Sequence, residues 1–451
     1  MLLMGNGPLI TRDPENPWIN PGGIIIKGRR IIAIGTWDEM KNYYHHHRDS
    51  NGEENQVIDV DGKVIMPGLI NGHNHMYSAF AKGMDFDLGP TEHFNEILEN
   101  VWWRLDENLT LEATYYSGIT TMMASIKNGV TTLIDHHASY GEIHGSLDIL
   151  SKAIKETGVR ACLSYEISDR HGSEACEKAI EENIIFQKNL RNDDSKRIGS
   201  LIGLHASFTL SDQTIEKVKN MNVNTIGYHL HVSEAIEDEI HCQSNYSKSV
   251  TQRLYEHGLL KPGTLIGHGI HISDEDRLIL KKSGVMIIHN PESNMANGVG
   301  VPDVVKMMSD GMVVGLGTDG YTSDMLESLK VANILQKHHH QRGDVGTSEA
   351  IEMLFTNNGK IASMLFDETI GQLSVGALAD VIVMDYQPNT PMNMSNYNSH
   401  ILFGLQGNMT NTVVIDGKII YSNRQFVYLE EEEILKESQK AAEHVWRKIY
   451  E

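Results

Sequence analysis

Residues 64–75 read VIMPGLINGHNH, an apolar run followed directly by two histidines, and this stretch decides the fold prediction. His73 and His75 occupy positions i and i+2 of an extended chain, so both imidazoles leave it on the same side, about 7 Å apart. At that separation both rings can converge on one metal ion at about 2.0–2.1 Å from each nitrogen. Active sites of α/β barrels are built at the carboxyl ends of the strands, where this pair would lie. The stretch therefore predicts a metal site at the end of a parallel strand.

Strand and helix patterns alternate through the middle of the chain, with glycines between them. The candidate strands lie at 64–71, 129–136, 158–166, 199–206, 224–232, 264–269, 284–290 and 312–318. Eight strands joined by helices are the number that a closed (β/α)8 barrel requires, so we predict a TIM-like α/β barrel. A doubly wound open sheet is the structural alternative, but it would need a nucleotide-type G-x-G-x-x-G loop, which the sequence lacks.

Both ends of the chain have a β-rich texture with tight turns. Residues 22–35 and 57–64 at one end are similar in this respect to residues 379–384 and 412–421 at the other. We expect the two ends to pair into one small β-sandwich beside the barrel. The predicted domains are the N-terminal part of the sandwich (1–66), the barrel (67–375), the C-terminal part of the sandwich (376–429) and a terminal helix (430–451).

Composition and charge argue against a nucleic-acid-binding, membrane or secreted protein. The net charge of −22 argues against nucleic-acid binding, which depends on clustered Lys and Arg. No apolar run is long enough to span a membrane, and the first residues do not form a signal peptide. Three cysteines without C-x-x-C spacing indicate a reducing compartment. We therefore expect a cytoplasmic protein with a small-molecule substrate, no membrane or nucleic-acid partner and, on base rates, a symmetric homo-oligomeric state.

Histidines and one aspartate recur where the predicted strands end. The residues are His73, His75, Asp135, His136, His137, His205, His229, His231, His268, His289 and Asp319. A single histidine near a strand end is usually a core residue, but packing does not explain seven such clusters at one end of successive strands. We predict that they surround one site. The tracts at 45–47 and 338–340 are interpreted instead as solvated surface histidines without useful acidic partners.

Two carboxylates complete the predicted chemistry. Asp319, in GLGTDG (315–320), would give a mixed nitrogen and oxygen ligand set that suits zinc or ferrous iron; a helix N-cap or turn is the alternative. Glu234 follows His231 by three residues, close enough to exchange a proton with a water on the metal. Its alternative is a solvated position in the acidic run 234–239.

The ordered motifs resemble those of the amidohydrolase superfamily, in the branch of cytosine/guanine deaminase-like and chlorohydrolase-like enzymes. They are MPGLINGHNH (66–75), LHASFTLS (204–211), HLHVSE (229–234), GHGIHIS (267–273), HNPESNM (289–295) and GTDG (317–320). Within that branch, WWRLDENLT (102–110) and IDHHAS (134–139) look similar to the aminohydrolases called SsnA-type. The resemblance covers essentially the whole chain.

The resemblance implies a metal ion held by four side chains, His73, His75, His231 and Asp319. Binuclear relatives carry a carboxylated lysine at the end of the fourth strand, whereas residues 199–208 (GSLIGLHASF) contain no lysine. We therefore expect one divalent ion per subunit, with zinc favoured and iron(II) as the alternative.

The resemblance also implies catalytic roles for Glu234 as proton shuttle, for His268 as the residue that positions the water or the tetrahedral intermediate, and for Asp319. His205 matches a substrate-contacting histidine. We add His136, Trp103 and Asn294 as candidate substrate contacts. Their alternatives are support of a ligand by His136, core packing by Trp103 and anchoring of a loop by Asn294.

Together these features predict a metal-dependent hydrolase of non-peptide carbon–nitrogen bonds, which deaminates a purine- or pterin-like heterocycle with a metal-bound hydroxide. Ammonia is a poor leaving group unless it is protonated, which gives Glu234 a role. A chlorohydrolase expels chloride, which needs no proton, but this activity and hydrolysis of a cyclic amide stay open as alternatives. A non-catalytic scaffold is the least favoured reading, because such a protein should have lost a ligand or the proton shuttle.

Overall fold

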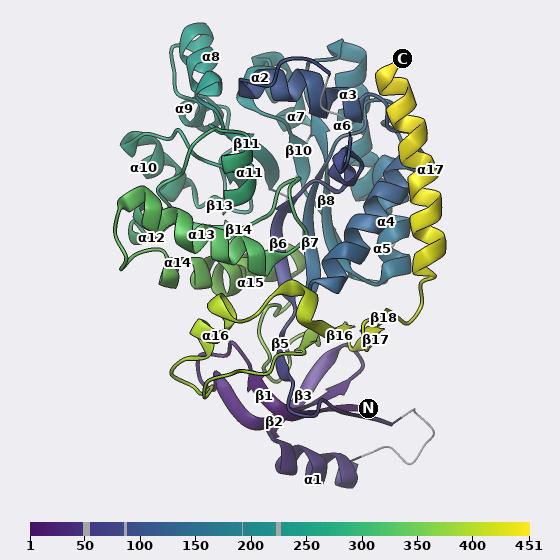
Figure 1. Cartoon of the computed structure of the whole chain (residues 1–451). Helices are drawn as coiled ribbons and strands as arrows, with labels where there is room; N and C mark the ends of the chain where they lie inside the picture. The colour runs from purple at the N-terminus through teal and green to yellow at the C-terminus, as the bar shows by residue number, and fades with distance from the viewer. Residues whose placement is uncertain (48–54, 85–87, 192, 222–226) are drawn as a thin grey trace.

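Two sheets organise the computed structural model, which describes residues 1–47, 55–84, 88–191, 193–221 and 227–451. The larger unit is a ring of parallel strands surrounded by helices (Figure 1). Around the ring, the strands are β6 (Leu69–Asn74), β7 (Val130–His137), β8 (Arg160–Ile167), β10 (Ile202–Leu204), β11 (Tyr228–Val232), β12 (Leu265–His268), β13 (Met286–His289) and β14 (Val313–Leu316), while β9 (Ile198–Ser200) pairs with β8. The predicted TIM-like barrel is confirmed.

The barrel closes between its first and last strands at their carboxyl ends. Asn74 forms an isolated parallel bridge with Asp319. The backbone N–H groups of Thr318 and Asp319 both donate to the His73 carbonyl oxygen, at 3.1 and 3.0 Å. We call this contact between β6 and β14 the seam of the barrel. It brings His73 and His75, from the start of the barrel sequence, next to Asp319, from its end.

The predicted strand 64–71 is wrong in one respect, since it is two strands in different sheets. β5 (Val64–Pro67) pairs with the antiparallel β15 (Val381–Met384), and β6 begins only after Gly68. A β-carbon on Gly68 would lie 2.2 Å from the Thr131 hydroxyl oxygen, so glycine is required where the chain crosses between the sheets. The start of the predicted strand 224–232 lies outside the described residues, which resume at 227.

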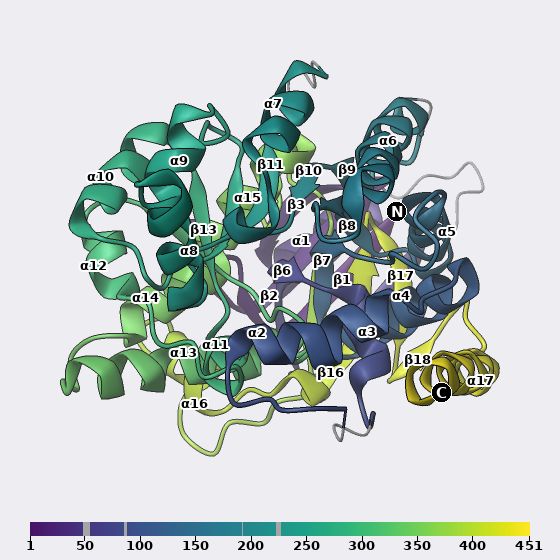
Figure 2. The ribbon, with the colours of Figure 1, turned by 90° about the horizontal axis from the view of Figure 1, so that it is seen from above.

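Helices cover the outside of the barrel, as the view from above shows (Figure 2). Those that follow the barrel strands are α4 (Leu111–Lys127), α5 (Ser146–Thr157), α6 (Gly172–Leu190), α7 (Asp212–Asn220), α8 (Ile236–Tyr246), α9 (Val250–Glu256), α10 (Asp274–Ser283), α11 (Pro291–Ala296), α12 (Val304–Ser309), α13 (Met325–His340), α14 (Thr347–Ile351) and α15 (Asn358–Phe366). Their apolar faces pack on the strands to form the main core. No helix in the described ranges is both long and apolar enough to cross a membrane.

The second sheet is built from both ends of the chain. Besides β5 and β15, it contains β1 (Leu2–Ile10), β2 (Trp18–Lys27), β3 (Arg30–Thr36), β4 (Gln56–Asp59), β16 (Thr410–Ile415), β17 (Lys418–Ser422) and β18 (Gln425–Phe426). Helix α1 (Trp37–His47) follows β3, and α16 (Tyr397–Phe403) lies between β15 and β16. The last helix, α17 (Glu431–Tyr450), returns to the barrel and packs against α4 (Figure 1).

One buried ion cluster joins the barrel to the second sheet. Arg160, the first residue of β8, is fully buried, and its Nη2 lies 3.1 Å from Asp380 Oδ2 and 2.6 Å from Asp416 Oδ1. Both aspartates belong to the C-terminal part of the second sheet, next to β15 and β16. Asp380 therefore depends on a guanidinium that its own sheet does not supply, while Asp416 is shared between Arg160 and Arg29 of the second sheet.

Candidate metal and active site

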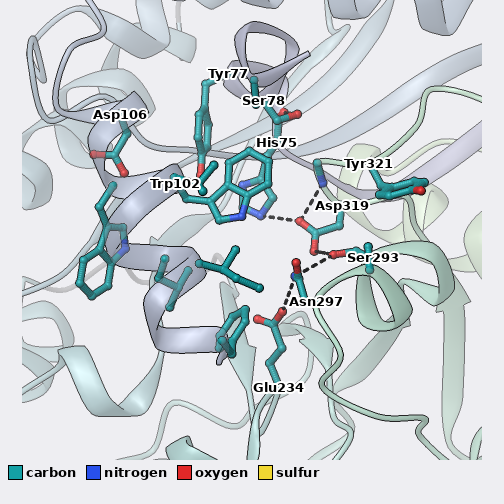
Figure 3. Close-up of a pocket in the computed structure, with 18 of the residues that line it drawn as sticks. His75, Tyr77, Ser78, Trp102, Asp106, Glu234, Ser293, Asn297, Asp319 and Tyr321 are labelled. Carbon is teal, nitrogen blue, oxygen red and sulfur yellow. Dashed lines mark hydrogen bonds and ion pairs between the residues drawn. The ribbon is translucent and has the colours of Figure 1, made fainter. Parts of the chain in front are cut away.

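A cavity of about 520 Å³ opens at the carboxyl ends of the barrel strands. Its floor contains His75, His231, His268 and Asp319. Its roof is the helical segment made of α2 (Phe94–Ile97), a π-helical turn (Leu98–Trp102) and α3 (Trp103–Asp106), which turns Phe94, Leu98, Val101 and both tryptophans toward it. The cavity thus combines a polar floor with an apolar roof (Figure 3).

The four predicted ligands converge at the floor. His75 Nε2 lies 3.0 Å from Asp319 Oδ1 and 3.3 Å from His231 Nε2, and His73 Nε2 lies 3.8 Å from Asp319 Oδ1. Ligands of a tetrahedral zinc ion with bonds of 2.0–2.1 Å lie about 3.3–3.4 Å apart. The donor atoms of His73, His75 and Asp319 lie close enough together to share one divalent ion, and His231 lies beside His75.

Hydrogen bonds to the Nδ1 atoms determine that the histidine rings keep their lone pairs on Nε2, the nitrogen that faces the predicted metal position. His75 Nδ1 donates to the His136 carbonyl oxygen at 2.6 Å, which leaves Nε2 as the nitrogen with the lone pair. His268 Nδ1 contacts Asn294 Oδ1 at 2.8 Å with the same effect. Within the described residues, the buried Nε2 atoms of His73 and His268 have no hydrogen-bond partner. Buried nitrogens without partners are costly unless something occupies the point that they face, and a metal ion or its water would do so.

Three residues at the strand ends adopt left-handed backbone conformations. Ser233, His268 and Asp319 have φ angles of 49°, 72° and 55°. Non-glycine residues rarely occupy this region, and such strain concentrates at functional sites. The turns redirect the chain just after β11 and β12 and just beyond β14, so Glu234, His268 and Asp319 all point into the cavity rather than along the barrel wall.

Glu234 and His268 face each other beside the convergence point. Glu234 Oε2 lies 3.4 Å from His268 Nε2, and His268 Nε2 lies 3.7 Å from Asp319 Oδ2. Burial raises the pKa of Glu234 to about 7, although His268 acts in the opposite direction. Burial would also raise the pKa of Asp319, but the charges of His75 and His268 hold it well below its usual range. The two carboxylates are thus set apart, one able to carry a proton near neutral pH and one kept ionised.

Two further residues that the sequence reasoning missed complete this hydrogen-bond network. Ser293 Oγ donates to Asp319 Oδ2 at 2.6 Å, and Asn297 Nδ2 lies 3.5 Å from Glu234 Oε1 (Figure 3). Both belong to or directly follow α11, which begins in the HNPESNM motif. The sequence did contain a signal for this pair. Ser293 and Asn297 are four residues apart, so on a helix that begins in this motif they lie on the same face.

An acidic pair at the other end of the cavity was also missed. Asp106 and Glu166 line the wall, and both accept from Arg170 Nη2, at 2.6 and 3.2 Å. All three side chains are buried, and Trp103 and Tyr140 pack on the guanidinium. Asp106 Oδ1 has no hydrogen-bond partner in the part of the chain that the structure describes. Burial raises the pKa of Asp106 to about 8 against the opposing charge of Arg170.

The predicted substrate contacts separate into two groups. His205 and Trp103 line the cavity and face each other, with ring centroids 6.3 Å apart. His136 lies under the floor, where its Nε2 contacts the Leu204 carbonyl oxygen at 3.0 Å, and Asn294 lies behind His268. The geometry of the last two matches the supporting alternatives that were considered for them.

The two surface histidine tracts lie away from the cavity, on α1 and at the end of α13. One expectation about them is wrong, because the fold brings an acidic partner to the second tract. His340 Nε2 lies 3.1 Å from Asp303 Oδ1, and His339 is close enough for the three side chains to share an ion. The sequence separation of Asp303 from the tract hides this contact.

Comparison with known proteins supplies the family. Residues 64–420 match the profile of the Amidohydrolase family. A 5'-deoxyadenosine deaminase of Methanosarcina mazei is 29% identical over 453 residues, covering 99% of each chain. A 5-methylthioadenosine/S-adenosylhomocysteine deaminase of Thermococcus sibiricus is 31% identical over 424 residues, covering 93% of each. The crystal structure of an adenosine deaminase from Xanthomonas campestris with bound zinc superimposes with a TM-score of 0.84, at 17% identity and 98% coverage of both chains, a likeness of fold.

Proposed function

The chain belongs to the amidohydrolase family, a family of hydrolases. We propose that it deaminates adenine nucleosides and that the reaction needs one divalent metal ion, for which zinc is the favoured identity. The proposed ligands are His73, His75, His231 and Asp319. The observation that carries the proposal is that the donor atoms of His73, His75 and Asp319 lie close enough to share one ion, with His231 beside His75 and the buried Nε2 of His73 without a partner among the described residues. The names of the relatives support the choice of an adenine nucleoside.

The residues around this point can perform the proton transfers of a deamination. A divalent ion held there would supply a water whose pKa is about 7 instead of 15.7. Glu234 is placed to take a proton from that water and to deliver it to the departing amine. His268 and the ionised Asp319 orient the water by hydrogen bonds, and Ser293 holds the second oxygen of Asp319 in place. A chloride leaving group would need no proton, so the buried Glu234 favours deamination over dechlorination.

Removal of the metal tests the proposal directly. Dialysis against a chelator is expected to remove about one ion per chain and to abolish ammonia release from adenine nucleosides, because unassisted water stays un-ionised at neutral pH. Zinc or ferrous iron should restore the activity. Elemental analysis checks the metal content, and the same chelator preloaded with zinc serves as the control. Full activity in protein shown to be free of metal would exclude the proposal.

The acidic end of the cavity suits the hydroxyl groups of a nucleoside sugar. Asp106 Oδ1 is a buried acceptor without a partner, and hydroxyls are neutral donors that could satisfy it. Of the described lining residues, Lys82 at the exposed rim is the only lysine or arginine, so a negatively charged substrate tail finds little support deep in the cavity. We therefore propose that the sugar lies toward Asp106 and the adenine ring toward the metal ligands.

Asp106→Asn is expected to lower kcat/KM for adenosine roughly 2- to 10-fold, the effect of losing a hydrogen bond of about 0.5–1.5 kcal/mol between neutral groups. For 2',3'-dideoxyadenosine, which lacks the two hydroxyls, the loss should be several-fold smaller. Steady-state ammonia release with both nucleosides measures the difference. Equal losses for the two substrates would show that Asp106 acts only through the structure of its pair with Arg170.

A further inference from the structure

We propose that His229 and Ser164 are positioning residues that determine which nitrogen of His73 carries the proton, so that His73 can act as a ligand. This inference rests on the proposed function, because it concerns the metal ion assigned there. Neither residue lines the cavity, and both are buried in the barrel, on β11 and β8. They act through His73 and do not touch the substrate.

The three side chains form an unbroken chain of hydrogen bonds that ends at a backbone carbonyl. Ser164 Oγ lies 2.9 Å from the Asp135 carbonyl oxygen and 3.2 Å from His229 Nδ1. His229 Nε2 lies 2.8 Å from His73 Nδ1. The far nitrogen of His73, Nε2, is buried and has no partner among the described residues.

The carbonyl determines the direction of every bond in this chain. A carbonyl oxygen can only accept, so the single hydroxyl proton of Ser164 points to Asp135, because otherwise two acceptors would face each other at 2.9 Å. The Ser164 oxygen then accepts from His229 Nδ1–H, and the Asp135 carbonyl oxygen accepts from His229 as well, so both partners hold the proton on Nδ1. In a neutral ring this leaves the lone pair on His229 Nε2, which accepts from His73 Nδ1–H. Nε2 of His73 is thereby left with its lone pair facing the predicted ion.

The opposite direction would prevent metal binding by this residue. If His229 carried its proton on Nε2, it would donate to His73 Nδ1, and the proton of a neutral His73 would move to Nε2. An N–H group would then point at the ion in place of a lone pair. In His75 a single hydrogen bond leaves the lone pair on Nε2, because Nδ1 donates directly to the His136 carbonyl oxygen. At His73 two side chains replace that single carbonyl, and both can be mutated.

His229→Leu tests the first link of the chain. The substitution removes the acceptor for His73 Nδ1–H, and the affinity for zinc is expected to fall about 10- to 100-fold, as is usual for partners that orient a metal-ligating histidine. Competition with a chromophoric chelator measures the affinity, and the absorption bands of the cobalt-substituted protein report the ligand set. The melting temperature is recorded for each variant, since a merely structural role would lower it without changing either metal readout.

His137→Leu is the matched control. His137 is equally buried, on β7, and neither of its ring nitrogens has a hydrogen-bond partner within the described ranges. The same substitution there removes the same volume but no hydrogen bond, so zinc affinity should stay within about three-fold of the wild type. Equal affinities of His229→Leu and wild type would overturn the inference. A wild-type protein that binds no ion would overturn the proposed function as well, and so the two failures are distinguishable.

The second link is tested by a smaller change, which guards against a His229 variant that does not fold. Ser164→Ala removes one of the two acceptors that face His229 Nδ1–H and leaves the Asp135 carbonyl oxygen, so it should weaken zinc binding about 3- to 10-fold, less than His229→Leu does. Ser164→Thr keeps the hydroxyl and should bind like the wild type. Equal zinc affinity of the alanine and threonine variants would contradict the role of Ser164.

Discussion

Glu234→Gln is expected to lower kcat for deamination by about 10²–10⁴-fold while the bound metal is retained. Glutamine has the shape of glutamate but cannot carry a proton between the water and the leaving amine. Glu234 lies 3.4 Å from His268 and is not among the four proposed ligands, so its loss should leave the metal site intact. Steady-state ammonia release and elemental analysis of the same sample measure the two quantities.

Glu237→Gln is the matched control for this variant. Glu237 lies three residues further along, in the first turn of α8, and is not part of the cavity wall. The same chemical change there should leave kcat and metal content close to those of the wild type. If Glu234→Gln were as active as Glu237→Gln, Glu234 would lose its assigned role. If it were inactive because its metal was lost, the residue would be a ligand instead of a proton carrier.

Arg160→Met is expected to lower the free energy of unfolding by about 3–5 kcal/mol, because it leaves the buried Asp380 without its cation and Asp416 with only the partly exposed Arg29. Arg160 is fully buried and lies between Asp380 and Asp416. Methionine is apolar, so it cannot satisfy either carboxylate. Urea denaturation followed by circular dichroism measures the change, and unfolding rates replace it where unfolding is irreversible.

Arg29→Met provides the comparison, because Arg29 pairs with the same Asp416 at 3.2 Å but keeps 32% of its side chain exposed. An exposed pair contributes only about 0–1 kcal/mol. The expected result is therefore a large loss for Arg160 and a small one for Arg29. Similar losses for both would show that burial of the Arg160 cluster does not govern its contribution.

Much of the barrel could be predicted from the sequence, because its strands are short apolar runs with chemistry-bearing residues at one end. The ends of seven runs carry His or Asp, and parallel strands in a barrel bring such ends together. The boundary at Gly68 could not be predicted in this way, since β5 and β6 form one continuous apolar run. Only the pairing partners of the two strands separate them.

The end of the cavity that contains Asp106 and Glu166 was not predicted from the sequence. Glu166 lies near the end of β8 and Arg170 in the turn that follows it, whereas Asp106 lies on α3, and no spacing in the sequence connects it with the other two. Their contact depends on how the roof helix lies over the barrel. His136 and Asn294 illustrate a different difficulty. The sequence pattern places His136 at a strand end and Asn294 just beyond one, but it does not say whether either side chain faces the cavity or supports a neighbouring group.

The seam between β6 and β14 has a consequence for the order of folding and metal uptake. His73 lies on the first strand of the barrel, His75 directly follows that strand, and Asp319 follows the last one. The full set of proposed donors therefore exists only after the final strand has joined the first, so a tightly held ion would be acquired late, by a chain that has already completed its ring. Since an ion that binds only the folded chain stabilises it by mass action, zinc supply would also determine how long the ring stays closed.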